Sequence, residues 1–227
     1  MKVAILQSNY IPWKGYFDMM AMVDVFVLYD EVQYTKNDWR NRNKIIANGK
    51  PQWITIPVRQ NSLDQRIDET EIVLPKWPVK HWKTIQANYG KAPFFKEYGP
   101  KVEALYEACK GVKLLSEINF IFIKGIAEML GVDTELKWST DLDLKGDKNE
   151  RLIDAVKKCG GTRYVSGPAA KSYLDVDAFS REGIEVEWMD YSGYKEYPQS
   201  GEGFEHGVSV LDLIFNVGDS SRGFLKF

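Results

Sequence analysis

The chain has 227 residues, 44% of them hydrophobic, which is enough for one α/β domain with an ordinary core. Thirty basic residues nearly balance 32 acidic ones, so no overall charge favours nucleic acid as a partner. The two cysteines, Cys109 and Cys159, lack the spacing of a disulfide framework or metal site, which indicates a cytoplasmic compartment. The first 17 residues contain no secretion signal, and charges within residues 114–130 argue against a membrane span.

The N-terminal segment predicts a strand, a helix and a second strand. Residues 2–6 are apolar, residues 15–23 have helical spacing, and residues 25–29 are apolar again. This order is typical of two parallel strands joined by a crossover helix.

An Asn48-Gly49 pair follows, and it supplies the positive φ angles of a tight turn. We therefore expect a β-hairpin formed by residues 44–47 and 52–58. Residues 71–74 have the composition of a short edge strand.

Residues 75–131 form a helical middle section, with expected helices at 79–89, 99–109 and 114–130. The rest of the chain returns to α/β order, with expected strands at 136–138, 163–165 and 184–189 and expected helices at 148–159, 177–182 and 208–217. The fold class is therefore α/β, with an open, mainly parallel sheet, an inserted β-hairpin and the helical middle section. We expect residues 1–227 to form a single domain.

The segment DEVQYTKNDWRNRNK, residues 30–44, is the densest polar and aromatic cluster, and it begins where the second strand should end. Ligands of open parallel sheets bind beyond the carboxyl ends of strands. Arginines present forked donors to phosphate, and aromatic rings stack on a base or sugar. The candidate binding residues here are Lys36, Arg40 and Arg42 for phosphate, Tyr34 and Trp39 for stacking, and Asn41 for amide contacts. The alternative is a solvated loop held by local ion pairs.

Two further loops also follow predicted strands. In QSNYIPWKGYF, Gln7 and Tyr10 are the candidate site residues, whereas packing in the core explains Trp13, Tyr16 and Phe17 equally well. In YVSGPAAKSYLD, which starts at Tyr164, small residues would let a ligand approach the backbone, although a plain strand-to-helix connection explains them equally well. Residues 190–207 are rich in aromatic residues and glycine, and we expect an ordered lid.

Familiar cofactor and metal motifs are absent from the sequence, including the glycine-rich phosphate loops and H-E-x-x-H. Two histidines cannot make a three-histidine metal site, so no metal is predicted. The cofactor stays unknown and the use of ATP stays open. His206, beside the expected lid, is a candidate general base, whereas His81 lies on an expected helix.

The chain resembles the WbqC-like family in several segments: QSNYIPWKGYF, LYDEVQYTKNDWRNRNKI, WITIPV, RYVSGPAAKSYLD, YPQ and SVLDLIFNVG. One departure is that family members typically have proline where Ser8 or Asn9 stands. Within these segments we add Gln33, Ser166, Gln199 and Asn216 to the candidate substrate-binding residues.

The resemblance implies a role in bacterial O-antigen or capsule polysaccharide biosynthesis, as a transferase of an acyl or aminoacyl group, such as glycine, to a nucleotide-linked amino sugar. In this interpretation Asp30 or His206 takes the proton from the attacking amine. A fold-level analogy with adenylating nucleotidylyltransferases places Trp13 and Tyr16 where those enzymes carry the histidines of H-x-G-H. Neither residue supplies positive charge, so Lys14, Lys36 or Arg40 would have to do so.

Two other functions stay open from the sequence. One is a non-catalytic subunit that holds a nucleotide sugar or a partner enzyme in the same pathway. The other is single-stranded nucleic-acid binding through residues 39–44, which we do not favour. The oligomeric state stays open as well.

Overall fold

The computed structural model describes residues 1–227 and has a five-stranded parallel sheet at its centre, in the order β7-β2-β1-β8-β9. The strands are β1 (Lys2–Leu6), β2 (Val25–Leu28), β3 (Arg42–Ala47), β4 (Lys50–Thr55), β5 (Val58–Arg59), β6 (Glu71–Ile72), β7 (Glu135–Trp138), β8 (Arg163–Ser166) and β9 (Glu185–Trp188). The α-helices are α1 (Lys14–Ala21), α2 (Trp77–Tyr89), α3 (Phe95–Ala108), α4 (Leu115–Leu130), α5 (Lys148–Lys158), α6 (Val176–Arg181) and α7 (Val210–Val217). Short 3-10 helices are η1 (Ile67–Glu69), η2 (Ser139–Leu142), η3 (Pro168–Ser172) and η4 (Gly218–Phe224). The predicted fold class is confirmed.

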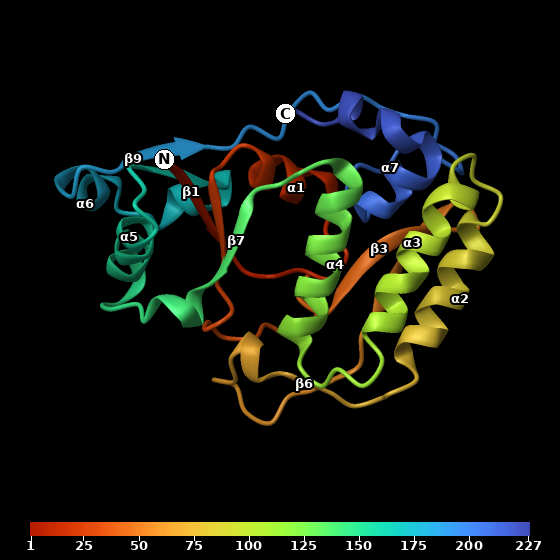
Figure 1. Cartoon of the computed structure of the whole chain (residues 1–227), viewed down its shortest axis with the longest axis horizontal. Coiled ribbons are helices and arrows are strands. Elements are labelled where there is room, and N and C mark those ends of the chain that lie inside the picture. The colour runs from red at the N-terminus through yellow and green to blue at the C-terminus, as the bar shows by residue number, and fades with distance from the viewer.

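Alternating side chains of the central strands enter two different hydrophobic clusters. Val3 and Ile5 belong to a cluster of 14 buried residues that includes residues of α5 and α6. Ala4, Phe26 and Leu28 belong to a cluster of 42 buried residues, which extends through α1, α2, α3, α4 and α7. Figure 1 shows α5 and α6 on one side of the molecule and α2 and α3 on the other. That residues 1–227 form a single domain stays a prediction.

The predicted hairpin is confirmed as β3 and β4, paired antiparallel from Arg42 opposite Thr55 to Ala47 opposite Lys50. Asn48 and Gly49 have φ angles of 51° and 73°, as a tight hairpin turn requires. The expected second strand was too long, because β4 ends before Pro57, which has no N–H to donate. The chain then forms β5, which pairs with β6.

Helix α3 begins at Phe95, so the start predicted at Gly99 was wrong. Gly99 and Pro100, which signalled a helix start, lie inside the helix instead. Tyr98 and Val102 are buried on one face, and this packing overrides the local preference. None of the helices is long and apolar enough to cross a bilayer.

The strand order places a topological switch point between β1 and β8. The chain builds β2 and β7 on one side of β1, and only later adds β8 and β9 on the other side. In open α/β sheets a crevice forms beyond the carboxyl ends of the two strands at such a point. The segments after Leu6 and Ser166 are therefore in position to form a binding site.

Asn119 of α4 bonds the loop after β1, which borders this crevice, and a later segment of the chain, between β2 and β3. Its side-chain Nδ2 donates to Ser8 Oγ and to the backbone oxygen of Arg40, both at 2.9 Å. Asn119 is fully buried. The amide therefore fixes the loop after β1 against the segment between β2 and β3.

We expect Asn119→Ala to lower the free energy of unfolding by about 2 to 4 kcal/mol, because it removes two buried hydrogen bonds and leaves their acceptors unpaired. Asn88→Ala is the matched control, since the half-buried Asn88 amide also makes two bonds, to Thr84 of its own helix and from the backbone N–H of Asn48, but the second is exposed to solvent. Its cost should stay below about 1 kcal/mol. Urea unfolding followed by circular dichroism measures both, and equal losses would contradict the assigned role of Asn119.

Candidate functional site

A cavity of about 660 Å³ lies at the switch point, and we call it the switch-point cavity. Its size suits a small organic ligand. The polar residues that line it are Gln7 after β1, Ser166 at the end of β8, Tyr29 after β2, Lys148 and Asn149 at the start of α5, and Tyr173 after η3. The cavity thus combines amides, a hydroxyl, a cation and phenol rings.

Lys148 has a φ of 36°, which is uncommon for a residue with a side chain. A capping box formed by Asp147 and Glu150 holds the helix start around it. Such local strain persists only where the surrounding structure imposes it, and it is frequent at binding sites. Lys148 is therefore a cation held at the edge of the switch-point cavity.

A second cavity, of about 360 Å³, is lined by Asn9, Trp13, Trp39, Asn43 and Gly207, and we call it the tryptophan cavity. Trp39 is 38% exposed and its ring centroid lies 5.0 Å from that of Trp53 on β4. The ring of Trp13 occupies the space over Gly15, where a Cβ would lie 2.4 Å from it. Glycine is thus required at position 15 for Trp13 to reach the cavity.

Arg40 lies between the two cavities. Its guanidinium donates to Gln7 Oε1 at 3.1 Å and to Asn9 Oδ1, and Asp38 lies 3.6 Å away. Gln7 lines the switch-point cavity and Asn9 lines the tryptophan cavity. A ligand that extends from one cavity to the other would pass this charge.

His206 precedes Gly207 of the tryptophan cavity and contacts Lys14, the first residue of α1. The Lys14 Nζ lies 3.2 Å from His206 Nδ1, and 4.6 to 5.5 Å from the ring centroids of Tyr194, Tyr197 and Phe204. Burial lowers the pKa of Lys14. Burial, followed by the neighbouring Lys14, lowers the pKa of His206. The imidazole is therefore neutral at pH 7.

The 190–207 loop has no helix or strand, yet side-chain hydrogen bonds fix it. Buried Asp212 of α7 accepts from Tyr197 OH at 2.7 Å and from Gln199 Nε2 at 2.6 Å. Gln199 Oε1 in turn accepts from the backbone N–H of Glu205 at 2.8 Å. These bonds hold the segment that carries His206 in place.

Several predicted site residues lie together. Gln7 and Ser166 line the switch-point cavity, Trp39 lines the tryptophan cavity and Arg40 joins the two. His206 is next to the tryptophan cavity, while Gln199 supports its loop.

Other predicted residues make internal contacts instead. Tyr10 is fully buried, and its hydroxyl bonds His81 Nδ1 at 2.9 Å and Tyr106 OH at 2.7 Å. The ring of Tyr34 is 2% exposed and packs in the core, so it is not available for stacking. Asn41 donates to the backbone oxygen of Ile56 at 2.8 Å.

The remaining predicted residues lie outside both cavities. Gln33 donates to the backbone oxygen of Leu63 at 2.6 Å, and Asn216 to that of Asp212 at 2.8 Å. Lys36 is exposed. The Arg42 guanidinium lies 4.1 Å from the ring centroid of Trp53 and donates to the backbone oxygen of Asn37.

Asp30 supports the loop after β1. Its Oδ1 accepts from the backbone N–H of Ser8 at 2.8 Å, and the residue is 1% exposed. Burial raises the pKa of Asp30 to about 6, although the bonds from Ser8 and the charge of Arg40 act in the opposite direction. The carboxylate lines neither cavity.

The sequence interpretation did not identify Tyr29, Lys148, Asn149 and Tyr173 as site residues. Tyr29 is the last residue of the strand predicted at 25–29, so its position at a strand end was a usable signal. Lys148 and Asn149 start a predicted helix, but only the strand order shows that this helix faces β1.

We expect the free energy of unfolding of the unaltered protein to fall as the pH rises from about 4 to about 6. That of the Asp30→Asn variant, which has no carboxyl at this position, should not show this fall. The folded-state pKa of about 6 lies above the ordinary value of 3.8, so the folded protein binds the proton more tightly than the unfolded chain does. The difference should change by about 3 kcal/mol across this range. Urea unfolding of both proteins at several pH values measures it, and a pH-independent difference would contradict the burial of an ionisable Asp30.

Comparisons with known proteins find matches over nearly the whole chain. The model of the WbqC-like protein family matches residues 7–223. A protein of Mycobacterium tuberculosis (strain ATCC 25618 / H37Rv), named uncharacterized protein Rv1507c, is 44% identical over 227 residues, which cover all of this chain and 98% of that protein. No solved structure matches the chain. The chain belongs to the WbqC-like protein family.

Proposed function

We propose that the protein transfers an acyl or aminoacyl group, such as glycine, to the amine of a nucleotide-linked amino sugar in O-antigen or capsule polysaccharide biosynthesis. One observation carries the proposal: the Arg40 guanidinium bonds Gln7 of one cavity and Asn9 of a second cavity with different chemistry. A nucleotide sugar likewise has two unlike ends joined by a diphosphate. This correspondence supports a ligand that occupies both cavities.

The nucleoside would occupy the switch-point cavity. Tyr29 and Tyr173 offer rings for the base, and Asn149 and Ser166 offer polar groups for the base edge and ribose. The diphosphate would then lie toward Arg40, whose forked donors suit phosphate oxygens. Lys148, which lines the switch-point cavity, would add a second positive charge.

The amino sugar would occupy the tryptophan cavity. The indoles of Trp13 and Trp39 give flat apolar surfaces for the C–H faces of a pyranose ring, and Asn9 and Asn43 stand beside them. The sugar amine would then lie beside Gly207 and thus close to His206. We assign phosphate binding to Arg40 rather than Arg42, because Arg40 bonds a lining residue of each cavity, whereas Arg42 contacts Asn37 and Trp53.

The amine nitrogen would attack the carbonyl carbon of an activated acyl donor, such as an acyl adenylate made from ATP. A C–N bond forms, the bond to the leaving group breaks, and that group departs with the electron pair. The amine gives up a proton to His206. We assign this role to His206 rather than Asp30, since the Asp30 carboxylate faces Ser8.

Lys14 determines which ring nitrogen of His206 accepts the proton. A protonated Lys14 donates to Nδ1, which leaves the ring proton on Nε2. When Lys14 is neutral, Nδ1–H donates to its amine and Nε2 becomes the acceptor. His206 accepts the proton of the amine only in this second arrangement.

The test is to mix the protein with a nucleoside diphosphate-linked 4-amino-4,6-dideoxyhexose, ATP and glycine, and to follow the products by mass spectrometry. We expect a product heavier by one glycyl residue. Arg40→Ala should weaken binding of the nucleotide sugar about 10- to 100-fold, because one or two charge-assisted bonds are lost. Arg59→Ala, which removes an exposed arginine paired only with Glu71, is the control for calorimetry.

Binding without product for any acyl donor would replace the transferase with a non-catalytic nucleotide-sugar-binding subunit. Absence of binding to any nucleotide sugar would remove both functions. Unfolding of Arg40→Ala, measured by circular dichroism, would show that the arginine is structural.

Trp39→Ala should weaken binding of the same nucleotide sugar about 5- to 50-fold, while binding of the free nucleoside diphosphate changes less than about twofold. Trp53→Ala is the matched control, because Trp53 is equally exposed but does not line the cavity. Calorimetry with both ligands measures the difference. Equal losses for the two ligands would place the sugar elsewhere.

A further inference from the structure

A surface rich in lysine and free of acidic residues along the chain lies outside the candidate site, on α2 and the segments beside it. Residues 72–96 contain five lysines and no acidic residue, although the whole chain has a net charge of −2. The lysines are Lys76, Lys80, Lys83, Lys91 and Lys96, and all five are exposed. None of them forms an ion pair.

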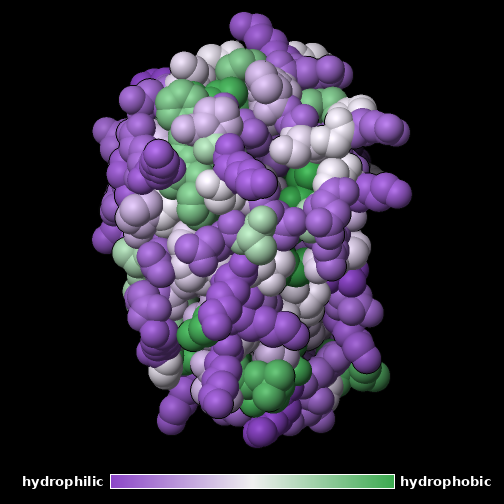
Figure 2. All heavy atoms as spheres, turned by 90° about the vertical axis from the view of Figure 1, so that its right-hand side faces the viewer, coloured by the Kyte–Doolittle hydropathy of each residue, from purple (hydrophilic) through white to green (hydrophobic).

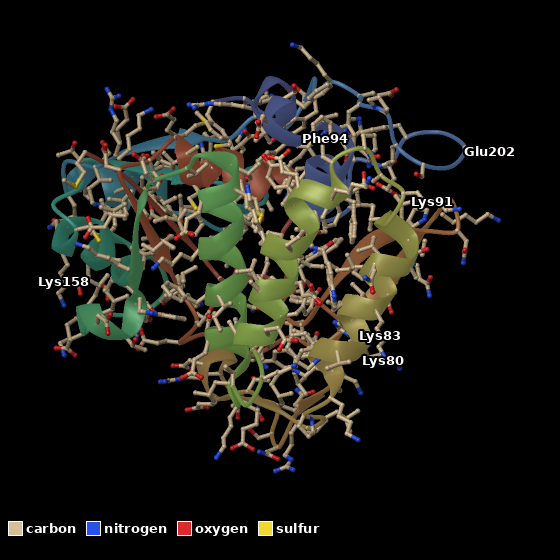
Figure 3. The ribbon with its side chains drawn as sticks, turned by 45° about the vertical axis from the view of Figure 1, so that its right-hand side comes forward. Lys80, Lys83, Lys91, Phe94, Lys158 and Glu202 are labelled. Atoms are coloured by element: carbon tan, nitrogen blue, oxygen red, sulfur yellow. The ribbon has the colours of Figure 1, made fainter.

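Helical spacing places Lys76, Val79, Lys80 and Lys83 on one face of α2, because they are separated by three or four residues. The opposite face, with Trp77, His81, Trp82, Ile85 and Tyr89, is buried. Figure 3 shows Lys80 and Lys83 along α2 and Lys91 just beyond it, with their side chains directed away from the body of the protein. We call this surface the lysine face.

Exposed aliphatic side chains accompany these charges. Leu74 is 58% exposed, and Val73 and Val79 are also exposed. Figure 2 shows the side of the molecule that carries α2 and α3, where small hydrophobic areas interrupt a largely hydrophilic surface. The surface therefore offers both positive charge and exposed aliphatic groups, the two features that attract a protein to an anionic membrane.

A groove of about 460 Å³ opens at the start of the lysine face. Lys76 and Lys80 line it, together with the apolar side chains of Pro57, Leu74 and Pro75. A lipid phosphate placed between the two ammonium groups would have its glycerol and upper acyl carbons against the apolar residues. The groove therefore matches an anionic phospholipid in both its charged and its apolar part.

We propose that the lysine face and its groove dock the protein onto an anionic phospholipid bilayer. Charge complementarity between the unpaired lysines of this face, Lys76, Lys80, Lys83 and Lys91, and the lipid phosphates provides the attraction, and Leu74 and Val79 contact the acyl boundary. A nucleic acid fits less well, because Trp77, which reaches the groove, and Trp82 are only 3% and 8% exposed, which leaves little ring surface for base stacking. This proposal is independent of the proposed function.

The test is co-sedimentation of the full chain with vesicles of phosphatidylcholine, with and without phosphatidylglycerol. We expect binding only to vesicles that contain phosphatidylglycerol, and loss of that binding at about 1 M salt, where the Debye length is about 3 Å. Replacement of Lys76, Lys80 and Lys83 by glutamine should weaken binding about a hundredfold, at about fivefold per lysine. All three side chains are exposed, so the fold should be unchanged by circular dichroism.

The matched control replaces three exposed lysines that also lack ion pairs and lie elsewhere, Lys124, Lys171 and Lys195, by glutamine. It should bind vesicles as the unaltered protein does. Leu74→Ser should weaken vesicle binding about three- to tenfold. This variant separates a bilayer from a purely ionic partner, which would not sense the lost aliphatic group.

Three results would overturn the proposal: no binding to phosphatidylglycerol vesicles, an equal loss in the two triple variants, or no effect of Leu74→Ser. If the protein instead binds a single-stranded oligonucleotide through Lys76, Lys80 and Lys83 and ignores the vesicles, the lysine face is a nucleic-acid surface.

Discussion

The short loop after β1 is fixed by polar contacts from three other parts of the chain, and both cavities depend on it. The Asp30 carboxylate accepts from the backbone of Ser8, and Asn119 of α4 donates to the Ser8 hydroxyl. Gln7 and Asn9, on either side, both accept from Arg40. Because Ser8 points inward and its two neighbours point toward Arg40, a loop without regular structure presents each neighbour to a different cavity.

The same arrangement explains why Arg40 has a different role from the other charged residues of its segment. The Arg40 guanidinium bonds two neutral amide oxygens, which do not cancel its charge, and also forms an ion pair with Asp38 at 3.6 Å. Arg42, two residues later, is on β3 and faces Trp53. Residues two apart point to the same side only within a strand, and Arg40 precedes the first residue of β3. The chain turns between the two arginines, and only Arg40 contacts residues that line the cavities.

Local signals predicted much of the fold, whereas long-range packing decided the site. The Asn48-Gly49 turn and the alternation of apolar segments with helical ones are encoded within a few residues, so the hairpin, the parallel sheet and the helical section followed from the sequence. The burial of Tyr10 and Tyr34 depends on contacts with residues far along the chain, such as the bond from Tyr10 to Tyr106. An aromatic residue in a polar segment gives no local sign of whether its ring faces the core or a ligand.

The segments that resemble the family therefore contain two kinds of residue: some line a cavity, and others hold the surrounding loops in place. The YPQ and SVLDLIFNVG segments meet at Asp212, which accepts from Tyr197 and Gln199. None of these three residues lines either cavity. Asp212 is nevertheless essential to the arrangement, because a buried carboxylate is costly without donors and its two donors come from the loop that carries His206. Movement of that loop away from α7 would remove both donors from Asp212 Oδ2, while Oδ1 already lacks a partner, so the contacts to Asp212 favour the loop position that keeps His206 near the tryptophan cavity.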